Sequence, residues 1–379
     1  MSWPLVPLLN CCSVSTGKHD ANHGEVNGCY PFYTCADKPI RANTFSFDGD
    51  SIILPGNGAN VGLVLFYSGK FEAYQRTYVL NKFVESVDSR YVYHHLNRYW
   101  KLRNERTQFG SATNYIRMQN FEDYEIPLPP LAEQQRIAAI LDKADAIRRK
   151  RQQAIQLADD FLRAVFLDMF GDPVTNPKGF KTRFLGDFYI DGKNGTKCGP
   201  FGSALKKDEY TESGIPIWGM DNINLNGEFI DAPSQWVSEE KYRELESYSL
   251  CQGDVIISRA GTVGKMGVVR SISQRSLIST NLIRVRFGAL LLPEYFVSLM
   301  TYCKGRVGRL KVGPDGAFTH MNVGVLDTLE FPYPPIQLQE KYLDVRRKVM
   351  GVLDKEEYSR KSLAYLFDSI SQKAFSGKL

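Results

Sequence analysis

The chain has 379 residues, of which 43% are hydrophobic and 23% are charged. This length suits two domains that each bury their own core, and the composition excludes a disordered or fibrous chain. The net charge of +5 is only mildly basic, so a polyanionic partner such as a nucleic acid is permitted but not required.

Cysteine usage and hydropathy favour a cytoplasmic protein. The seven cysteines are odd in number and form no Cys-x-x-Cys pair, which argues against a disulfide framework and against a zinc ribbon. No apolar run reaches the ~20 residues that a membrane-spanning helix needs. The first twelve residues, MSWPLVPLLNCC, lack the basic start and the cleavage site of a signal peptide.

Residues 1–126 are predicted to form a first globular domain. Short apolar runs interrupted by glycine, asparagine and proline, such as SIILPGNGANVGLVLF at 51–66, are typical of short strands and turns. Near residues 91–103, apolar residues recur three and four apart, which predicts a helix. The basic residues along or near this helix are equally compatible with a solvated face and with phosphate contacts: Arg90, Arg98, Lys101, Arg103 and Arg106.

The segment 127–173 is predicted to hold one long helix. Residues 131–170 contain no glycine or proline, follow Pro129 and Pro130, and precede Gly171 and Pro173, which are helix start and stop signals. Apolar residues repeat with a seven-residue period, which places one seam toward a partner helix. The residues predicted to line this seam are Ile137, Ile140, Ala144, Ile147, Arg151 and Phe161.

Residues 174–331 are predicted to form a second globular domain of strands and glycine-rich turns, with GDVIISRAGTVGKMGVV at 253–269 as an example. Long cations and amides in the turns of both domains are candidates to contact phosphates or base edges of DNA. These candidates are Asn57, Asn60, Arg76, Lys197, Lys206, Lys207, Arg259, Lys265, Arg275 and His320.

The segment 332–379 is predicted to be a second long helix and reveals an internal duplication. Its helix-pairing positions are Val345, Val349, Val352, Glu356, Leu363 and Leu366. Pro127, Pro129, Pro130, Leu131, Gln134 and Ile137 recur 205 positions later as Pro332, Pro334, Pro335, Ile336, Gln339 and Tyr342. Such a displacement predicts two related units, each a globular part followed by a helix.

The predicted fold is α+β, with two repeated globular domains joined by two long antiparallel helices that form a coiled coil. The first helix leaves one globular part and enters the other, and an antiparallel second helix returns the chain toward its start. A helix of about 40 residues is about 60 Å long. It would therefore separate the two globular domains by more than one turn of duplex DNA. The helix length would then set the distance between the two half-sites of a DNA target.

Arg151 and Glu356 are the charged residues that occupy the shared inner positions of both helices, each near its helix midpoint. Because the midpoints of antiparallel helices meet, we predict that the two side chains pair and fix the register. The alternative is that either side chain extends outward to water.

Several kinds of chemistry are excluded by the sequence. GTVGK at 261–265 has Arg259 where a phosphate-binding loop needs glycine and Met266 where it needs serine or threonine. The paired prolines read LPPL and YPPI, whereas a methyltransferase acting on base amino groups has Asn or Asp before two prolines and an aromatic residue after them. His19 and His23 lie in a glycine- and asparagine-rich segment without a helix to hold their spacing, so we expect no metal site there. Because these motifs are incomplete, we also expect no catalytic residue.

The segments PLPPLAEQQRIAAILDKADAIRRKRQQAIQLADDFLRAVFLDMFGDP and PPIQLQEKYLDVRRKV through KAFSGKL resemble the two conserved helical regions of the specificity subunit of type I restriction-modification enzymes. CGPFGSALKKDEY, GIPIWGMDNI and GDVIISRAGTVGK resemble a common form of that family's target recognition domain. The first domain departs from this pattern, since LPGNGANVG stands where the second domain has SRAGTVGK.

The resemblance implies that 1–126 and 174–331 are target recognition domains, each reading one half of a bipartite DNA sequence, and that the segments 127–173 and 332–379 are spacer helices that dock two methyltransferase subunits. Motor and nuclease subunits would join this core, and the partners would use S-adenosylmethionine, ATP and Mg while this chain holds no cofactor. The alternatives are a self-contained DNA methyltransferase and a coiled-coil scaffold for protein assembly.

Overall fold

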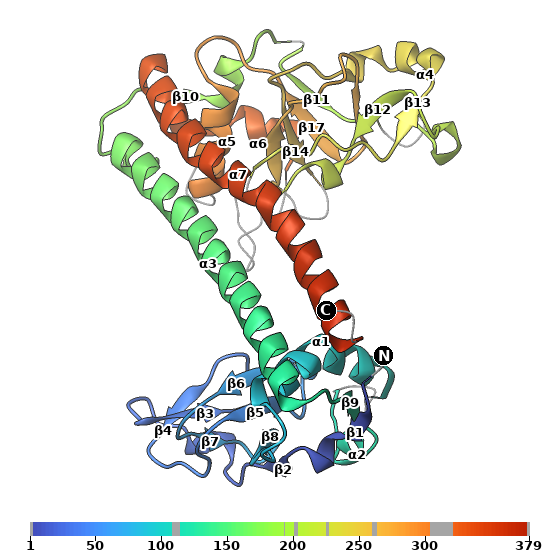
Figure 1. The fold of residues 1–379 in the computed structure, drawn as a ribbon. Coiled ribbons are helices and arrows are strands. Elements are labelled where there is room, and N and C mark those ends of the chain that lie inside the picture. Colours follow the sequence, from blue (N-terminus) through green and yellow to red (C-terminus); the bar gives the residue numbers. More distant parts are fainter. Residues whose placement is uncertain are drawn as a thin grey trace. The chain divides into compact units, whose positions relative to one another are not determined.

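The computed structural model describes residues 3–107, 114–192, 194–200, 204–224, 227–259, 264–303 and 321–376, with only the backbone for 105–107, 353–368 and 371. The fold is α+β, as predicted (Figure 1). The chain divides into two compact units, Met1–Gln153 with Glu356–Leu379, and Ala154–Lys355. Each of the two long helices, α3 (Leu131–Phe170) and α7 (Ile336–Phe375), therefore contributes one half to each unit.

The first unit contains two small sheets and a terminal strand pair. The four-stranded sheet has the order β2-β8-β5-β6, the three-stranded sheet has the order β4-β3-β7, and β1 pairs with β9. The strands are β1 (Leu5–Pro7), β2 (Ser13–Thr16), β3 (Tyr30–Tyr33), β4 (Ile40–Ala42), β5 (Ser51–Pro55), β6 (Leu65–Tyr67), β7 (Glu72–Ala73), β8 (Thr77–Asn81) and β9 (Glu125–Pro127). Helices α1 (Ser89–Thr107) and α2 (Gln119–Glu122) follow β8.

The second unit repeats this topology strand for strand. Its sheets have the orders β11-β17-β14-β15 and β13-β12-β16, and β10 pairs with β18. The elements are β10 (Thr182–Phe184), β11 (Thr196–Cys198), β12 (Ile215–Trp218), β13 (Trp236–Val237), α4 (Glu239–Glu244), β14 (Val255–Ser258), β15 (Met266–Val268), β16 (Leu277–Ile278), β17 (Leu282–Val285), α5 (Pro293–Tyr302), α6 (Val323–Asp327) and β18 (Glu330–Pro332). In both units the pairing inside the smaller sheet includes one parallel pair, β3 with β7 and β12 with β16. The sequence duplication is thus a duplication of fold.

The central strand of each larger sheet is buried on both faces. In β5, Ile52 and Leu54 face a core shared with α1, whereas Ile53 joins a core shared with the smaller sheet. In β14, Val255 and Ile257 face the core that contains α5, and Ile256 lies in a second core on the opposite face. This double burial explains why both strands read as continuous apolar runs rather than as alternating ones.

A buried glutamine side chain fixes the start of each long helix. Gln134 Nε2 donates to the carbonyls of Pro129 (2.8 Å) and Ser86 (3.0 Å), and its Oε1 accepts from the amide of Asp88 (2.9 Å). Gln339 makes the same three bonds, from Nε2 to Pro334 O (2.9 Å) and Leu290 O (3.1 Å), and to Oε1 from the amide of Leu292 (2.9 Å). Both side chains are fully buried, so three backbone groups per unit depend on one amide.

The two halves of α3 pack in different cores. Ile137, Ala138 and Leu141 belong to the core of the first unit. Phe166 and Phe170 belong to that of the second unit, where their rings lie 5.2 and 5.6 Å from the ring of Tyr342 in α7. In the second unit, the end of α3 therefore meets the beginning of α7, which an antiparallel arrangement requires.

The predicted seam is only partly reproduced. Ile137 is buried, and half-buried positions are Ile140, Ala144, Ile147, Arg151, Val345 and Val349. Phe161 and Val352 are 53% and 62% exposed, so for these two the prediction is wrong. Near the end of α3, Leu162 is buried and Phe166 joins the second unit's core, because a straight helix drifts away from a strict seven-residue repeat.

The side chain of Glu356, which is predicted to pair with Arg151, lies outside the described residues. The side chains of Leu363 and Leu366 also lie outside them. The register lock and the coiled coil stay predictions. Among the described residues, no helix combines the length and the apolar character that crossing a bilayer requires.

Two of the basic residues of α1, Arg90 and Arg103, bond other parts of the first unit. Arg90 Nε donates to both carboxylate oxygens of Asp142 in α3 (3.1 and 3.2 Å), and His94 Nε2 lies 2.7 Å from Asp142 Oδ1. Burial opposes ionisation of Asp142, but the hydrogen bonds and charges of Arg90 and His94 outweigh it and lower the pKa of this carboxyl. Arg103 donates to the carbonyl of Asp123 (2.8 Å).

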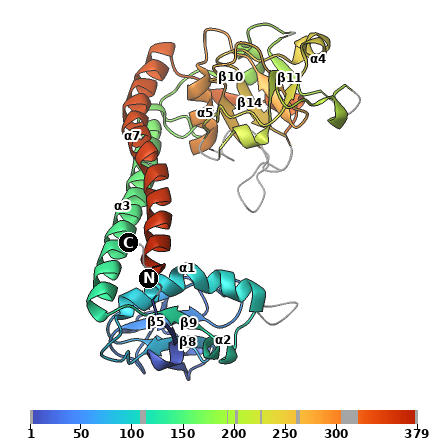
Figure 2. The same cartoon turned by 45° about the vertical axis from the view of Figure 1, so that its right-hand side comes forward.

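The end of α7 lies beside α1 (Figure 2), and an aromatic cluster joins the two helices. The Phe375 ring lies 5.5 Å from Tyr91, 4.9 Å from His95 and 5.9 Å from Tyr99. Burial in this cluster lowers the pKa of His95 to about 3. His95 is therefore neutral in the folded protein at neutral pH.

We predict that Gln134→Ala lowers the free energy of unfolding of the first unit, and Gln339→Ala that of the second, by about 3 kcal/mol each, because buried backbone groups lose their partners. Urea denaturation measures the change. The matched controls are Gln135→Ala and Gln337→Ala, exposed glutamines on the same helices, which should change stability by less than about 0.5 kcal/mol. Equal effects of buried and exposed substitutions would refute the anchor.

The lowered pKa of His95 predicts an acid-sensitive first unit. This histidine is protonated near pH 6.5 in the unfolded chain but only near pH 3 in the folded chain. The contribution of neutral His95 to the stability of the folded state is therefore complete above pH 6.5 and is lost as the pH falls. Between pH 7 and 5, the linkage relation gives a loss of about 2 kcal/mol from this residue. The His95→Phe variant should lose about 2 kcal/mol less free energy of unfolding than the wild type between pH 7 and 5. The Tyr99→Phe variant, changed in the same cluster, should show the wild-type loss.

Candidate nucleic-acid interface

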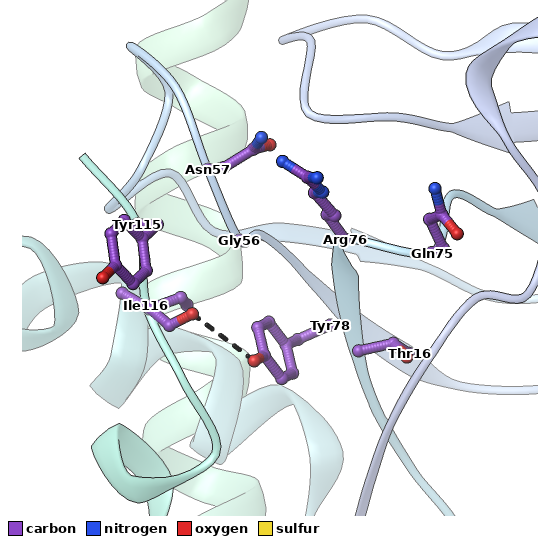
Figure 3. A pocket seen from close by; sticks show the side chains of 8 residues that line it. All are labelled: Thr16, Gly56, Asn57, Gln75, Arg76, Tyr78, Tyr115 and Ile116. Carbon is purple, nitrogen blue, oxygen red and sulfur yellow. Dashed lines mark hydrogen bonds between the residues drawn. The ribbon is translucent and has the colours of Figure 1, made fainter. Parts of the chain in front are cut away.

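A cavity of about 340 Å³ opens in the first unit where β5, the turn between β7 and β8, and the segment before α2 meet (Figure 3). It contains two of the predicted DNA-contacting residues, Asn57 and Arg76. The residues that line it are Thr16, Gly56, Asn57, Gln75, Arg76, Tyr78, Tyr115 and Ile116.

The backbone builds this cavity from three segments that lie far apart in the sequence. Gly56 donates to the carbonyl of Arg76 (2.9 Å), and Ile116 donates to the carbonyl of Gly56 (2.9 Å). A Cβ atom added at Gly56 would lie 2.2 Å from the Arg76 carbonyl oxygen, so only glycine permits this close approach. Asn57 forms an isolated backbone bridge with Tyr115, which brings these two residues together at the cavity.

The side chains of the cavity suit base-edge recognition. Gln75 and Arg76 are exposed, Asn57 and Tyr115 are half-buried, and in Figure 3 the Arg76 guanidinium extends toward the Asn57 amide. Arginine, asparagine and glutamine are the side chains that form paired hydrogen bonds with guanine and adenine edges. Gln75 and Tyr115 were not among the predicted DNA-contacting residues, because only the fold brings them close to Asn57. The one indication in the sequence was that Gln75 is the neighbour of Arg76.

Asn60 makes a hydrogen bond within the first unit, and its predicted contact with DNA stays a prediction. It is half-buried, and its Nδ2 donates to the carbonyl of Cys35 (2.8 Å), which ties the turn after β5 to the end of β3. This bond makes it a positioning residue for the turn that carries Asn57.

In the second unit, three of the predicted DNA-contacting side chains are engaged within the protein. Lys265 Nζ donates to the carbonyl of Met220 (3.0 Å). The ammonium of Lys197 lies 4.8 Å from the centre of the Tyr248 ring, and the guanidinium of Arg275 pairs with Glu239 Oε1 at 2.6 Å. These contacts engage the three cations within the unit, and their contacts with DNA stay predictions.

Three further candidates of the second unit lie within its described residues. Lys206 and Lys207 are exposed, and Lys207 begins a single 3-10 turn, Lys207–Glu209. Arg259 follows β14 and is held there by its amide, which donates to the carbonyl of Asn281 (3.0 Å). His320 lies outside the described residues.

Two arginines that sequence reasoning did not single out stabilise the second unit. Arg286 donates from Nε and from a terminal nitrogen to the two oxygens of buried Asp254, both at 2.7 Å. Arg284 is buried and donates to the carbonyls of Ser249 (2.7 Å) and Asn194 (3.2 Å). Its burial lowers the pKa of the guanidinium. Both side chains face inward and are therefore structural.

Comparison with known proteins adds sequence relationships to this geometry. Residues 9–157 match the family model of the type I restriction modification DNA specificity domain. The EcoDI specificity subunit of Escherichia coli is 34% identical over 174 residues, which cover 44% of this chain but only 37% of that relative's length. The MjaVIII specificity subunit of Methanocaldococcus jannaschii is 20% identical over the whole of this chain and 93% of its own.

Solved structures share the fold. The S subunit of the type I restriction-modification system of M. genitalium superimposes with a TM-score of 0.65 at 19% identity, covering 99% of this chain and 96% of that one. The chain as a whole is thus similar in sequence and fold to the specificity subunits of type I restriction enzymes.

Proposed function

We propose that this chain is the DNA-reading subunit of a type I restriction-modification complex and that each of its two units binds one half of a split DNA target. The observation that carries the proposal is the cavity of the first unit, where Asn57, Gln75 and Arg76 are presented at the end of a rigid sheet. The repeated topology supports a second reading surface in the other unit. Base contacts from both surfaces would specify two half-sites.

The chain itself is proposed to be non-catalytic, with DNA and other subunits as its partners. On this proposal, two methyltransferase subunits dock on α3 and α7 and use S-adenosylmethionine, and motor and nuclease subunits use ATP and Mg. This division of work rests on the similarity to specificity subunits. A genomic DNA target places the complex in the cytoplasm.

DNA binding should depend on the cavity of the first unit. We predict that Arg76→Ala and Gln75→Ala each lower the affinity for the cognate target by about 1–3 kcal/mol, which is roughly 5- to 150-fold, because each removes a base-edge contact. Fluorescence anisotropy at fixed salt measures this change in the complex with the methyltransferase subunits. Lys38→Ala, which removes an exposed charge of the same unit outside the cavity, should change the affinity by less than threefold.

The phosphate contribution is separated from the base contribution by salt. If Arg76 contacts a base, Arg76→Ala leaves the slope of log affinity against log salt unchanged; if it contacts a phosphate, the slope falls by about 0.9. Wild-type affinity in both cavity variants would contradict the proposed reading surface.

Methyl transfer should require a second polypeptide. Purified chain incubated with labelled S-adenosylmethionine and DNA is predicted to transfer no methyl group, whereas addition of the methyltransferase subunit should yield methylation at a split motif that sequencing of the methylated bases identifies. Methyl transfer by the chain alone would establish the self-contained methyltransferase instead. Methylation of one continuous motif would contradict the two half-sites.

A further inference from the structure

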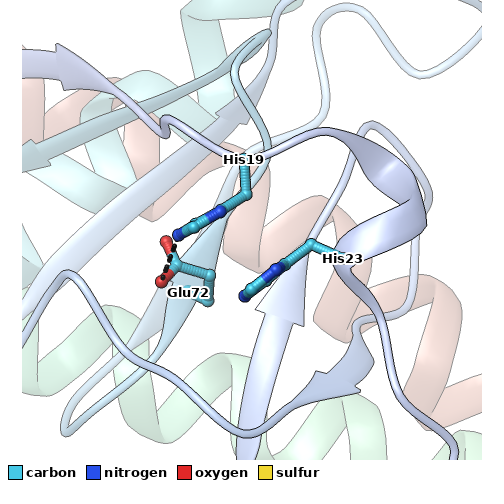
Figure 4. Close-up of side chains that lie close together, drawn as sticks. All are labelled: His19, His23 and Glu72. Atoms are coloured by element: carbon cyan, nitrogen blue, oxygen red, sulfur yellow. Dashed lines mark ion pairs between the residues drawn. The ribbon is translucent and has the colours of Figure 1, made fainter.

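A second cluster of polar side chains lies in the first unit, outside the cavity described above. It consists of His19, in the turn after β2, His23, at the end of the 3-10 turn η2 (Ala21–His23), and Glu72 in β7. One donor atom of each residue lies within 4.8 Å of the others. Figure 4 shows both imidazoles extending toward the Glu72 carboxylate.

Glu72 is an unusual residue for its position. Its side chain is fully buried, and its carboxylate accepts hydrogen bonds from Ser46 Oγ (2.9 Å) and from the amide of Ala73 (3.0 Å). The repeat offers an internal comparison, because Glu72 pairs with Phe32 as Leu277 pairs with Ile217. One unit thus has a carboxylate where the other has buried leucine, and a buried charge is costly without a positive partner.

We propose that His19, His23 and Glu72 bind one divalent transition-metal ion, with zinc as the best match. Two imidazoles and one carboxylate are a common protein ligand set for zinc, which leaves a fourth position for water. His19 Nε2 lies 3.7 Å from Glu72 Oε2, close to the roughly 3.3 Å that separates two ligands of a tetrahedral zinc ion. His19 and His23 are half-buried, so an ion can reach the site from solvent.

Metal binding would rearrange the imidazoles locally. The rings of His19 and His23 are stacked, with centres 3.7 Å apart and planes inclined by 10°. A metal ion lies near the plane of each ring that binds it, so one ring rotates about its Cβ–Cγ bond and the stack opens. The 2.7 Å contact between His23 Nε2 and Thr44 Oγ1 gives way to the metal bond in this rearrangement.

The metal site would stabilise the turn that carries Gln75 and Arg76. The carbonyl of His19 accepts a hydrogen bond from the amide of Gln75 (2.9 Å), and His19 forms a bridge with Tyr74. An ion bound by His19 and Glu72 would therefore join β7, the strand that precedes this turn, to the segment after β2 that bonds the turn directly. This consequence for DNA rests on the proposed function, whereas the metal site itself does not.

The test uses the full chain after treatment with a chelator. Isothermal titration calorimetry with Zn²⁺, and the visible absorption of the Co²⁺-loaded protein, should report one ion per chain in a four-coordinate site. His23→Ala and Glu72→Gln should weaken binding at least 10- to 100-fold, since loss of even an outer-shell partner has that effect. The amide of Glu72→Gln can still accept from Ser46, and thermal unfolding without metal verifies that both variants fold.

Two variants of nearby residues are the controls. Glu25→Gln removes an exposed carboxylate from the segment between η2 and β3, and Cys29→Ser removes an exposed thiol from it; both should bind the ion as the wild type does. Less than one equivalent of bound zinc, or unchanged affinity in both His23→Ala and Glu72→Gln, would overturn the site. Loss of binding in Cys29→Ser would assign the ion to thiols and would overturn it as well.

The effect on DNA is measured separately, as the affinity of the complex for its target with and without zinc. Tighter DNA binding with zinc in the wild type, absent in His23→Ala, supports the coupling. A complex that binds DNA equally well with and without the bound ion refutes the coupling. A chain that binds zinc but no DNA in any complex refutes the proposed function and leaves the metal site supported.

Discussion

The buried glutamine at the start of each long helix is the interaction on which the two units depend. A helix that follows two prolines leaves unsatisfied backbone groups at its junction with a globular domain. Gln134 and Gln339 satisfy backbone groups on both sides of that junction with one amide each. Because this amide bonds both to the helix start and to the segment before α1 or α5, it fixes where the long helix begins relative to that segment.

The duplication preserves the topology, while its side chains have diverged. Strand order needs only apolar residues at inward positions, so Ile53 of β5 has its counterpart in Ile256 of β14, each in the core shared with the smaller sheet. Polar chemistry differs at equivalent positions, since Val79 of β8 pairs with Ile53 as buried Arg284 of β17 pairs with Ile256. Two halves that share a framework and differ in their polar groups suit the recognition of two different DNA sequences.

Local patterns in the sequence predicted the helices and the repeat, but not the partners of the charges. The absence of glycine and proline gave helix α3 its observed limits, Leu131–Phe170. The partner of Arg90 is Asp142, and Lys265 bonds the carbonyl of Met220; both contacts join residues more than forty positions apart, which no local pattern reports. Gln75 near Asn57, and Glu72 near His19, required the fold for the same reason. The exposure of Phe161 reflects a change of packing partner along α3.

The most direct test of the account is a hydroxyl-radical footprint of the assembled complex on its target DNA. Two separate reading surfaces predict two protected segments with unprotected DNA between them, and substitution of Arg76 should weaken only the segment bound by the first unit. A single continuous protected segment, or equal loss of protection in both segments on changing Arg76, would contradict the assignment of one half-site to each unit.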